Sequence, residues 1–359
     1  MLEAFLEHFF AFDLTHWMHT AHWLLIAVGL VAGVLLLGKS ADVLVDEATE
    51  LSLKLGMPKV IVGATIVSLG TTTPEAVVSV MAAIGGTPGL ALGNAVGSII
   101  CDTGLILGAA CLITPIPLDR WLVNRQGLVQ FGAGLLLVAL CVPWTALGDA
   151  FTTGGRLPQW GGFLFLALLA AYVAWSVRVA KSKGRLAAVD IDQLEEIEVE
   201  EEEANRSTLA MVFILLVATF FVVIASEILI TAAIETAARL SVPEGVIAAT
   251  LVAFGTSLPE LTIAITASLK GRGELAIGNV IGADILNVLF VAGAAAAVTP
   301  GGLTAAPEFF SAQFPAMIAV LITFRIAIAC SKNDQMPRWA GGILVGFYVA
   351  YLGFTFLMQ

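Results

Sequence analysis

Long apolar runs, separated by short polar breaks or by glycine and proline, fill almost the whole chain. A helix needs about 20 such residues to cross about 30 Å of hydrocarbon. The pattern predicts ten membrane-spanning helices, at about residues 24–54, 58–84, 89–113, 126–144, 158–179, 208–238, 244–269, 274–298, 307–330 and 337–357. The first and sixth spans are longer than a bilayer requires, so we expect them to be strongly tilted or to continue beyond it.

Two sequence motifs each occur twice. The first motif is GATIVSLGTTTPE at 63–75 and AATLVAFGTSLPE at 248–260; the second is GNAVGSIICD at 93–102 and GNVIGADILN at 278–287. A constant offset of 185 residues aligns the copies without a gap and pairs Glu75 with Glu260. This duplication predicts two five-helix halves, and an odd number of spans per half gives the second half the opposite orientation in the membrane.

The predicted organisation therefore has four parts. These are an N-terminal interfacial segment (1–23), a first five-helix repeat (24–179), an acidic cytoplasmic linker (180–207) and a second five-helix repeat (208–359). The fold class is an all-α polytopic membrane protein with two inverted-topology repeats. Such repeats are typical of secondary transporters, whose substrate site lies near the middle of the membrane between the halves.

Composition supports a membrane protein and excludes an ordinary soluble enzyme. The chain is 58% hydrophobic and only 13% charged, and its mean hydropathy is +0.95, whereas soluble domains are near a quarter charged. Lysine and arginine gather in alternate loops, which predicts that both termini are extracytoplasmic and that the linker is cytoplasmic. We expect a multi-pass membrane protein that contacts the lipid bilayer and binds no nucleic acid.

Two polar segments have alternative interpretations. All four histidines lie in residues 1–22, interleaved with aromatic residues. An amphipathic helix in the headgroup region explains this composition, and a metal site at His16, His19 and His22 is the alternative. The acidic tract Asp190–Glu203 is expected to be a solvated part of the linker, with Ca²⁺ sensing as the alternative.

The first motif places oxygen atoms together inside a span. Pro74 has no N–H, so it releases the carbonyl of Gly70 from the helical ladder. Thr71 and Glu75 are four residues apart and therefore share a helix face. A hydroxyl, a free carbonyl and a carboxylate are expected to converge there.

The second motif repeats this arrangement, because Ser98 and Asp102 are also four residues apart. Its glycines are expected to allow close helix approach. Across both halves, the candidate cation ligands are Glu75, Glu260, Asp102, Asn287, Thr71, Thr72, Ser98, Thr256, Ser257 and Asp284. Asp42 and Glu227 occupy equivalent positions in spans 1 and 6, where we expect structural or gating roles, with ligation as the alternative.

These carboxylates need a mobile counter-ion. A carboxylate at the bilayer centre costs on the order of 3 kcal/mol, and the predicted spans place no lysine or arginine near the acids. Hard oxygen ligands suit Ca²⁺ or Na⁺ better than Zn²⁺ or Cu²⁺. No cofactor is expected, since the ions themselves would be the substrates.

At these motifs the sequence resembles the cation/Ca²⁺ exchanger superfamily, specifically its prokaryotic sodium/calcium exchangers. The resemblance covers roughly residues 39–113 and 224–298. It implies ten helices in two inverted repeats and ion sites formed by spans 2, 3, 7 and 8. It also implies movement of spans 1 and 6 as a gating pair and exchange of Na⁺ for Ca²⁺ at one shared cluster. The ligands that it implies are Thr71, Thr72, Glu75, Ser98, Asp102, Thr256, Ser257, Glu260 and Asn287.

The sequence departs from the family pattern at three positions. Asp102 and Asn287 are exchanged relative to the usual Asn in the first repeat and Asp in the second. Ala283 removes a hydroxyl, and Asp284 adds an acid that raises the prospect of K⁺ or H⁺ coupling. The expected function is Na⁺/Ca²⁺ antiport by alternating access. Ca²⁺/H⁺ or K⁺-dependent exchange on the same fold is the alternative, and a cation channel or a membrane scaffold is the alternative from another class.

Overall fold

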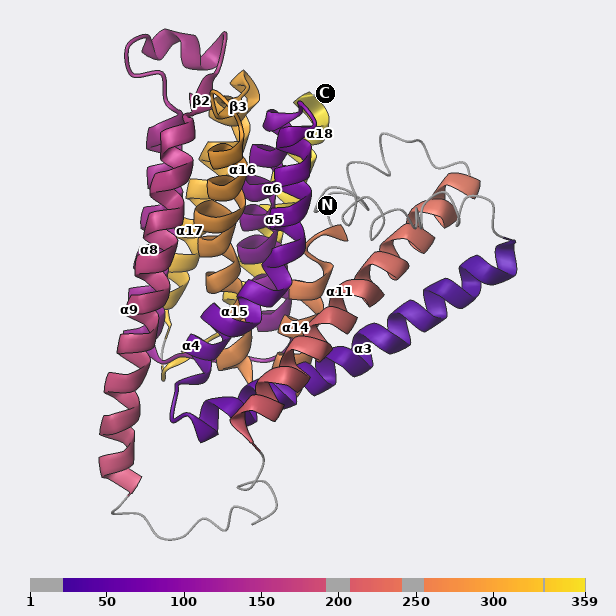
Figure 1. Cartoon of the computed structure of the whole chain (residues 1–359), viewed down its shortest axis with the longest axis vertical. Coiled ribbons are helices and arrows are strands. Elements are labelled where there is room, and N and C mark those ends of the chain that lie inside the picture. The colour runs from indigo at the N-terminus through magenta and orange to yellow at the C-terminus, as the bar shows by residue number, and fades with distance from the viewer. Residues whose placement is uncertain (1–21, 192–206, 241–254, 332, 359) are drawn as a thin grey trace.

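The chain folds into a bundle of helices with two very short sheets (Figure 1). The computed structural model describes residues 22–191, 207–240, 255–331 and 333–358. The first half consists of α3 (Trp23–Lys54), α4 (Lys59–Val62), the π-helical turn η1 (Gly63–Val67), α5 (Ser68–Ile84), α6 (Pro88–Cys101), the π-helical turn η2 (Asp102–Ile106), α7 (Leu107–Ile113), β1 (Ile116–Pro117), α8 (Arg120–Cys141), the 3₁₀ turn η3 (Leu147–Phe151), β2 (Gly155–Leu157) and α9 (Gln159–Ile191). The second half consists of α11 (Thr208–Arg239), α14 (Leu258–Leu269), α15 (Gly273–Leu286), the π-helical turn η5 (Asn287–Ala292), α16 (Gly293–Val298), β3 (Leu303–Ala305), the π-helical turn η6 (Phe309–Gln313), α17 (Phe314–Cys330), β4 (Gln335–Met336) and α18 (Arg338–Met358).

The described residues contain eight helices long and apolar enough to cross a membrane. Most of the predicted spans are among them. Only the end of the predicted span 244–269 is described, as the shorter apolar helix α14, and the predicted span 337–357 corresponds to α18, of 21 residues. The fifth span was predicted to end at 179, but α9 continues to Ile191, into the region expected to be linker. The histidines of the N-terminal segment other than His22, and most of the acidic tract, lie outside the described residues.

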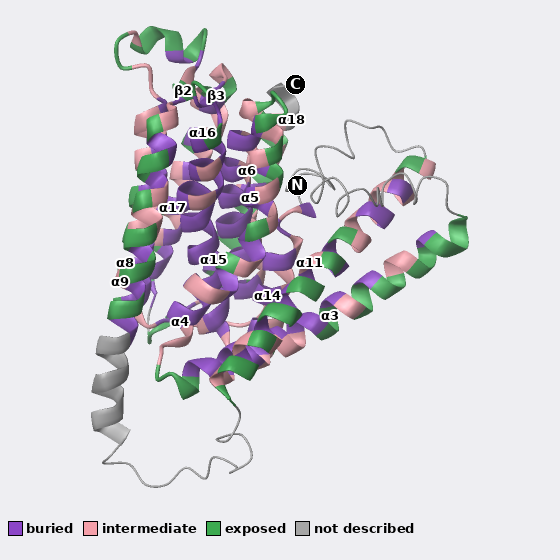
Figure 2. Ribbon diagram, in the orientation of Figure 1, coloured by how far each residue is buried: buried purple, intermediate pink, exposed green. Residues whose placement is uncertain are grey.

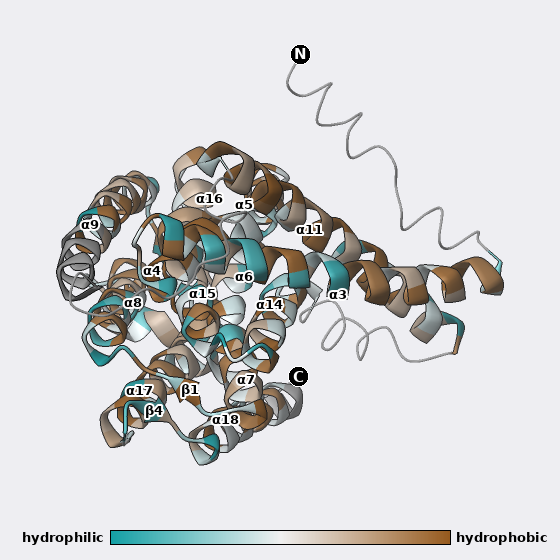
Figure 3. Cartoon of the chain, turned by 90° about the horizontal axis from the view of Figure 1, so that it is seen from below, coloured by the Kyte–Doolittle hydropathy of each residue, from teal (hydrophilic) through white to brown (hydrophobic). Residues whose placement is uncertain are grey.

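Helices α3 and α11 form a tilted pair. Each has 32 residues, and they lie against one another and cross obliquely to the other helices (Figure 1). Hydrophobic residues occupy much of their length, as the brown ribbon in Figure 3 shows from below. This oblique crossing agrees with the tilt expected of the two long spans, and their tilt relative to the membrane stays a prediction.

Helix α15 lies at the centre of the bundle. Residues 275–286 are all buried (Figure 2), so this helix is surrounded by protein rather than by lipid. Its glycines allow backbone contact with the first half: a Cβ on Gly278 would lie 2.4 Å from the carbonyl oxygen of Val60, and one on Gly282 would lie 2.5 Å from the Cα of Ala64. The second motif therefore packs directly against α4 and η1.

Equivalent turns connect the motif helices in the two halves. Gly86, between α5 and α6, has φ +87°, and Gly271, at the equivalent position between α14 and α15, has φ +68°. Only glycine adopts this conformation readily. Pro88 then begins α6, where its missing N–H would have had no helical partner. The two motifs of each half are thus connected by one tight turn.

The two small sheets join the halves at opposite ends of the bundle. Strand β1 pairs antiparallel with β4, aligning Ile116 with Met336, and β2 pairs antiparallel with β3, aligning Arg156 with Thr304. Each sheet takes one strand from each half. Figure 1 shows β2 and β3 at one end, and the view from the other end in Figure 3 shows β1 and β4.

Candidate cation-binding site

The first motif lies inside a continuous helix. Pro74 is an interior residue of α5, as the sequence predicts. Thr71 and Thr72 are fully buried and Glu75 is 2% exposed. The hydroxyl of Thr72 and Oε2 of Glu75 have no hydrogen-bond partner among the described residues. This part of α5 therefore offers buried oxygen atoms that are free to bind a ligand.

The second copy of the motif is built differently. Here the chain turns at Thr256 and Ser257, and α14 begins at Leu258. Glu260 consequently lies in the first turn of a helix, whereas Glu75 is in a helix interior. A helix N-terminus carries a partial positive charge that stabilises a nearby anion. Glu260 is 1% exposed, and its Oε2 has no described hydrogen-bond partner.

Both copies of the second motif end where a π-helical turn begins, at equivalent positions. The turn η2 begins at Asp102 and η5 begins at Asn287, which are 185 residues apart. π-Helical turns widen the helix locally and are frequent at functional sites. Asp102 and Asn287 are each 1% exposed, and Oδ1 of each has no described partner. Ser98, one turn before Asp102, is 5% exposed.

Side chains of the two halves interleave at the centre. The Thr71 hydroxyl lies beside the Glu260 carboxylate, and the Ser257 hydroxyl lies beside Asp102. Glu75 and Glu260 lie within electrostatic range of one another, as do Asp102 and Glu260. The structure therefore brings the predicted carboxylates of both halves together.

Among the described residues, no lysine or arginine forms an ion pair with these acids. The same part of the chain contains no group of three His, Cys, Asp or Glu side chains close enough to hold a metal by themselves. A cation at this place would therefore need hydroxyl, amide or carbonyl oxygens as well as carboxylates. Such a mixed set of hard oxygen atoms is suited to Ca²⁺ and Na⁺.

Asp284 has a separate environment that the sequence did not reveal. Thr103 Oγ1 and Gln130 Nε2 both donate hydrogen bonds to its Oδ2, the second at 2.5 Å. Its Oδ1 and the Oε1 of Gln130 have no described partner. Asp284 also lies within electrostatic range of Asp102, so it is a fourth buried acid beside the group. The signal that could have pointed here is the pair Gln126 and Gln130, four residues apart in an apolar span.

The family model for "Sodium/calcium exchanger protein" matches residues 25–178 and 210–357, which is most of the chain. The chain belongs to this exchanger family.

Individual relatives agree with this assignment. The sodium/calcium exchanger MaX1 of Methanosarcina acetivorans is 30% identical over 93% of this chain and 98% of its own length. The Ca²⁺/H⁺ antiporter ChaA of Bacillus subtilis is 24% identical over 79% of this chain and 80% of its own length. A solved structure of the sodium-calcium exchanger NCX_Mj, soaked with zero Na⁺ and Ca²⁺, superimposes with a TM-score of 0.75 at 24% identity, covering 92% of this chain and 99% of that one.

Membership of the exchanger family makes the chain a transporter rather than an enzyme. In this family Ca²⁺ and Na⁺ are the substrates, and transport requires no cofactor. The structural match supports a polytopic helical membrane fold.

A set of ion pairs connects the tilted pair to the bundle at one end of the exchanger fold. Lys270, at the end of α14, lies 3.1 Å from Oδ1 of Asp42 and 2.9 Å from Oδ2 of Asp46 on α3. Arg272 pairs with the other oxygen of Asp46. The sequence predicted a structural or gating role for Asp42, but it gave no indication that Asp46 takes part.

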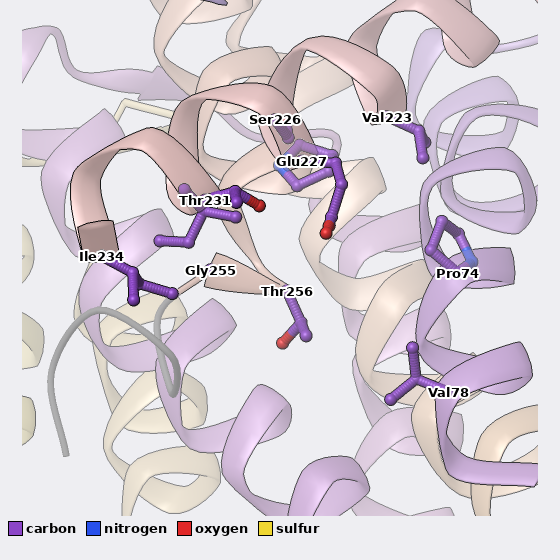
Figure 4. A pocket seen from close by; sticks show the side chains of 11 residues that line it. Pro74, Val78, Val223, Ser226, Glu227, Thr231, Ile234, Gly255 and Thr256 are labelled. Atoms are coloured by element: carbon purple, nitrogen blue, oxygen red, sulfur yellow. The ribbon is translucent and has the colours of Figure 1, made fainter. Parts of the chain in front are cut away.

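A cavity of about 230 Å³ lies between α11, α5 and α14 (Figure 4). Its walls include Pro74 and Thr256 from the first motif of each half, and Glu227 from α11. Thr256 is the one predicted ligand that is not buried. The cavity therefore lies directly beside the buried acids of the exchanger site.

Proposed function

We propose that this exchanger-family chain is a secondary active antiporter that exchanges Na⁺ for Ca²⁺ across a prokaryotic plasma membrane by alternating access. The observation that carries the proposal is the set of buried acids contributed by both halves. Their free oxygens have no described basic partner, so a mobile cation must compensate their charge. The ligands are the candidate threonines, serines and carboxylates together with Asn287.

The architecture is part of the proposal. Ten spans in two inverted five-helix repeats would place the ion site near the middle of the membrane, with both termini extracytoplasmic and the linker cytoplasmic. The equivalent turn glycines Gly86 and Gly271, and the equivalent π-helical turns, support the repeat. Three Na⁺ or one Ca²⁺ would then bind in turn to the same group of ligands.

A second function is favoured by a specific observation. Asp284 adds a fourth carboxylate, which one Ca²⁺ does not neutralise, and the relative ChaA is named a Ca²⁺/H⁺ antiporter. Ca²⁺/H⁺ or K⁺-dependent exchange is therefore the alternative. An open channel is disfavoured, because the free oxygens lie at residues with 5% exposure or less rather than along a pore.

The deciding experiment measures radioactive Ca²⁺ uptake by purified protein in vesicles. An opposing Na⁺ gradient at fixed pH is expected to drive saturable uptake. Equal uptake driven by a pH gradient without Na⁺ would favour the alternative, and a requirement for K⁺ would favour K⁺-dependent exchange. Non-saturable current without coupling would overturn antiport altogether.

A further inference from the structure

Glu227 is an acidic residue in an apolar span that the proposed ion site does not use. It lies in α11, just after the 18-residue segment that is the most apolar among the candidate spans of the described residues. Its side-chain partner is the Thr231 hydroxyl, one helical turn further along. Among the described residues no lysine or arginine pairs with it. An ionisable residue in such a place needs a compensating cation or water.

The equivalent acid in the first half shows what such a residue can bind. Asp42 lies 185 residues before Glu227 and pairs with the ammonium group of Lys270 at 3.1 Å. The position equivalent to Lys270 in the first half is Gly85, which has no charge. Within the described residues, the fold therefore places a basic side chain beside Asp42 and none beside Glu227.

Glu227 faces the cavity beside the ion site. Figure 4 shows its carboxylate directed into the space between α11 and Pro74, with the Thr256 side chain below it in this view. The described residues that line the cavity include no lysine, arginine or histidine. One carboxylate and three hydroxyl-bearing residues, Ser226, Thr231 and Thr256, thus border a volume of about 230 Å³.

Two residues that line the cavity lie close in sequence to the buried acid of the second half. Thr256 and Pro259 line it, and the next residue, Glu260, is 1% exposed. Glu227 itself is exposed. A cation moving from Glu227 past Thr256 would therefore pass from an exposed carboxylate to a buried one.

We propose that Glu227 is a capture residue, which binds the transported cation weakly with Thr231 and Thr256 and delivers it to Glu260. In the predicted topology this entrance is on the extracytoplasmic side. The inference rests on the proposed antiport function. An exposed carboxylate concentrates cations by its field without holding them tightly, so Glu227 affects the apparent affinity for the ion rather than the turnover rate.

The charge of the ion determines the size of the effect. A unit charge about 6 Å from Na⁺ in water-like surroundings changes its local concentration roughly threefold, and the same charge changes that of Ca²⁺ by the square of this factor, roughly tenfold. Glu227→Gln is therefore expected to raise the apparent KM roughly threefold for Na⁺ and roughly tenfold for Ca²⁺, with kcat unchanged. Both changes are expected only when the ion is supplied from the extracytoplasmic side.

The experiment compares initial Ca²⁺ flux in right-side-out and everted membrane vesicles, with Na⁺ or Ca²⁺ varied on the outer face of each. Glu227→Asp keeps the charge and is expected to stay near the parent. Ser226→Ala is the matched control, because Ser226 lines the same cavity but donates its hydroxyl to the Val222 carbonyl at 2.8 Å. It is expected to change neither constant by more than about twofold.

The outcomes separate this inference from the proposed function. An unchanged KM, equal changes from both sides, or the same factor for Na⁺ and Ca²⁺ in Glu227→Gln would overturn the capture role while leaving antiport by the parent intact. A parent protein without coupled Ca²⁺ flux would overturn both. Thermal unfolding of the variant in detergent, expected at or above the parental temperature, shows that a changed KM does not come from misfolding.

Discussion

Replacing Glu260 by glutamine tests whether the buried acids bind Ca²⁺ directly. The variant loses one negative charge at a position that is 1% exposed. Two unit charges about 4 Å apart interact by about 4 kcal/mol at an effective dielectric constant near 20, so Ca²⁺ loses about 8 kcal/mol of attraction. If the hydration that Ca²⁺ retains offsets half of this, binding weakens by about 4 kcal/mol, or roughly 1,000-fold.

The same substitution has the opposite effect on the ion-free protein. A buried carboxylate costs on the order of 3 kcal/mol in a membrane segment, and glutamine keeps the shape of the side chain without the charge. Glu260→Gln is therefore expected to unfold at a higher temperature than the parent when no ion is present. Ca²⁺ is expected to raise the unfolding temperature of the parent but not that of the variant.

The assay combines Ca²⁺ uptake into vesicles with thermal unfolding at several Ca²⁺ concentrations. Glu274→Gln is the matched control, because Glu274 carries the same charge at the start of α15, only partly buried, and it should behave like the parent. Parental uptake by Glu260→Gln, together with a parental Ca²⁺-dependent rise in unfolding temperature, would refute direct ligation.

Three further predictions concern other parts of the site. Asp102→Asn is expected to impair Ca²⁺ exchange more than Ala283→Ser in the same uptake assay, and equal exchange by the two variants would contradict a charged ion subsite at Asp102. Asp46→Asn removes the carboxylate that pairs with Lys270, an ion pair that we expect to hold α3 against the cytoplasmic end of the bundle. Because the pair is partly exposed and worth about 1 kcal/mol or less, the population open to the cytoplasm is expected to rise up to about fivefold. Cysteine labelling from the cytoplasmic side measures this change, and unchanged labelling would contradict the expected role of the ion pair. Gln130→Leu removes a hydrogen-bond donor from a buried acid and is expected to lower thermal stability by about 1–3 kcal/mol, whereas parental stability would show that the amide contributes little.

The sequence predicted the features that depend on composition and on the duplication. Apolar run length indicated most of the helices, and the 185-residue offset identified Glu75 and Glu260 as equivalent acids. The burial of the acids followed from their place in apolar segments. These inferences succeeded because membrane helices satisfy their backbone groups locally, so length and hydropathy suffice to predict them.

Other features require the tertiary structure. The two TPE motifs look alike in sequence, yet Glu75 lies within α5 and Glu260 lies at the start of α14. Gln130 donates a hydrogen bond to Asp284, and the two residues lie on different helices more than 150 positions apart along the chain. The expected close approach at the motif glycines is found at Gly278 and Gly282; for Gly93 and Gly97, the equivalent partners fall within 241–254, outside the described residues, and that expectation stays a prediction.

The backbone contact of α15 with α4 and η1 has a consequence for how the protein can move. Where main chains touch without an intervening side chain, neither segment can slide or rotate without a steric clash, because no rotamer can adjust. The contacts of Gly278 with Val60 and of Gly282 with Ala64 therefore join the two halves into one rigid body around the acids. In the proposed alternating access, the rearrangement is therefore expected at the periphery of the molecule, where ion pairs connect α3 to the bundle.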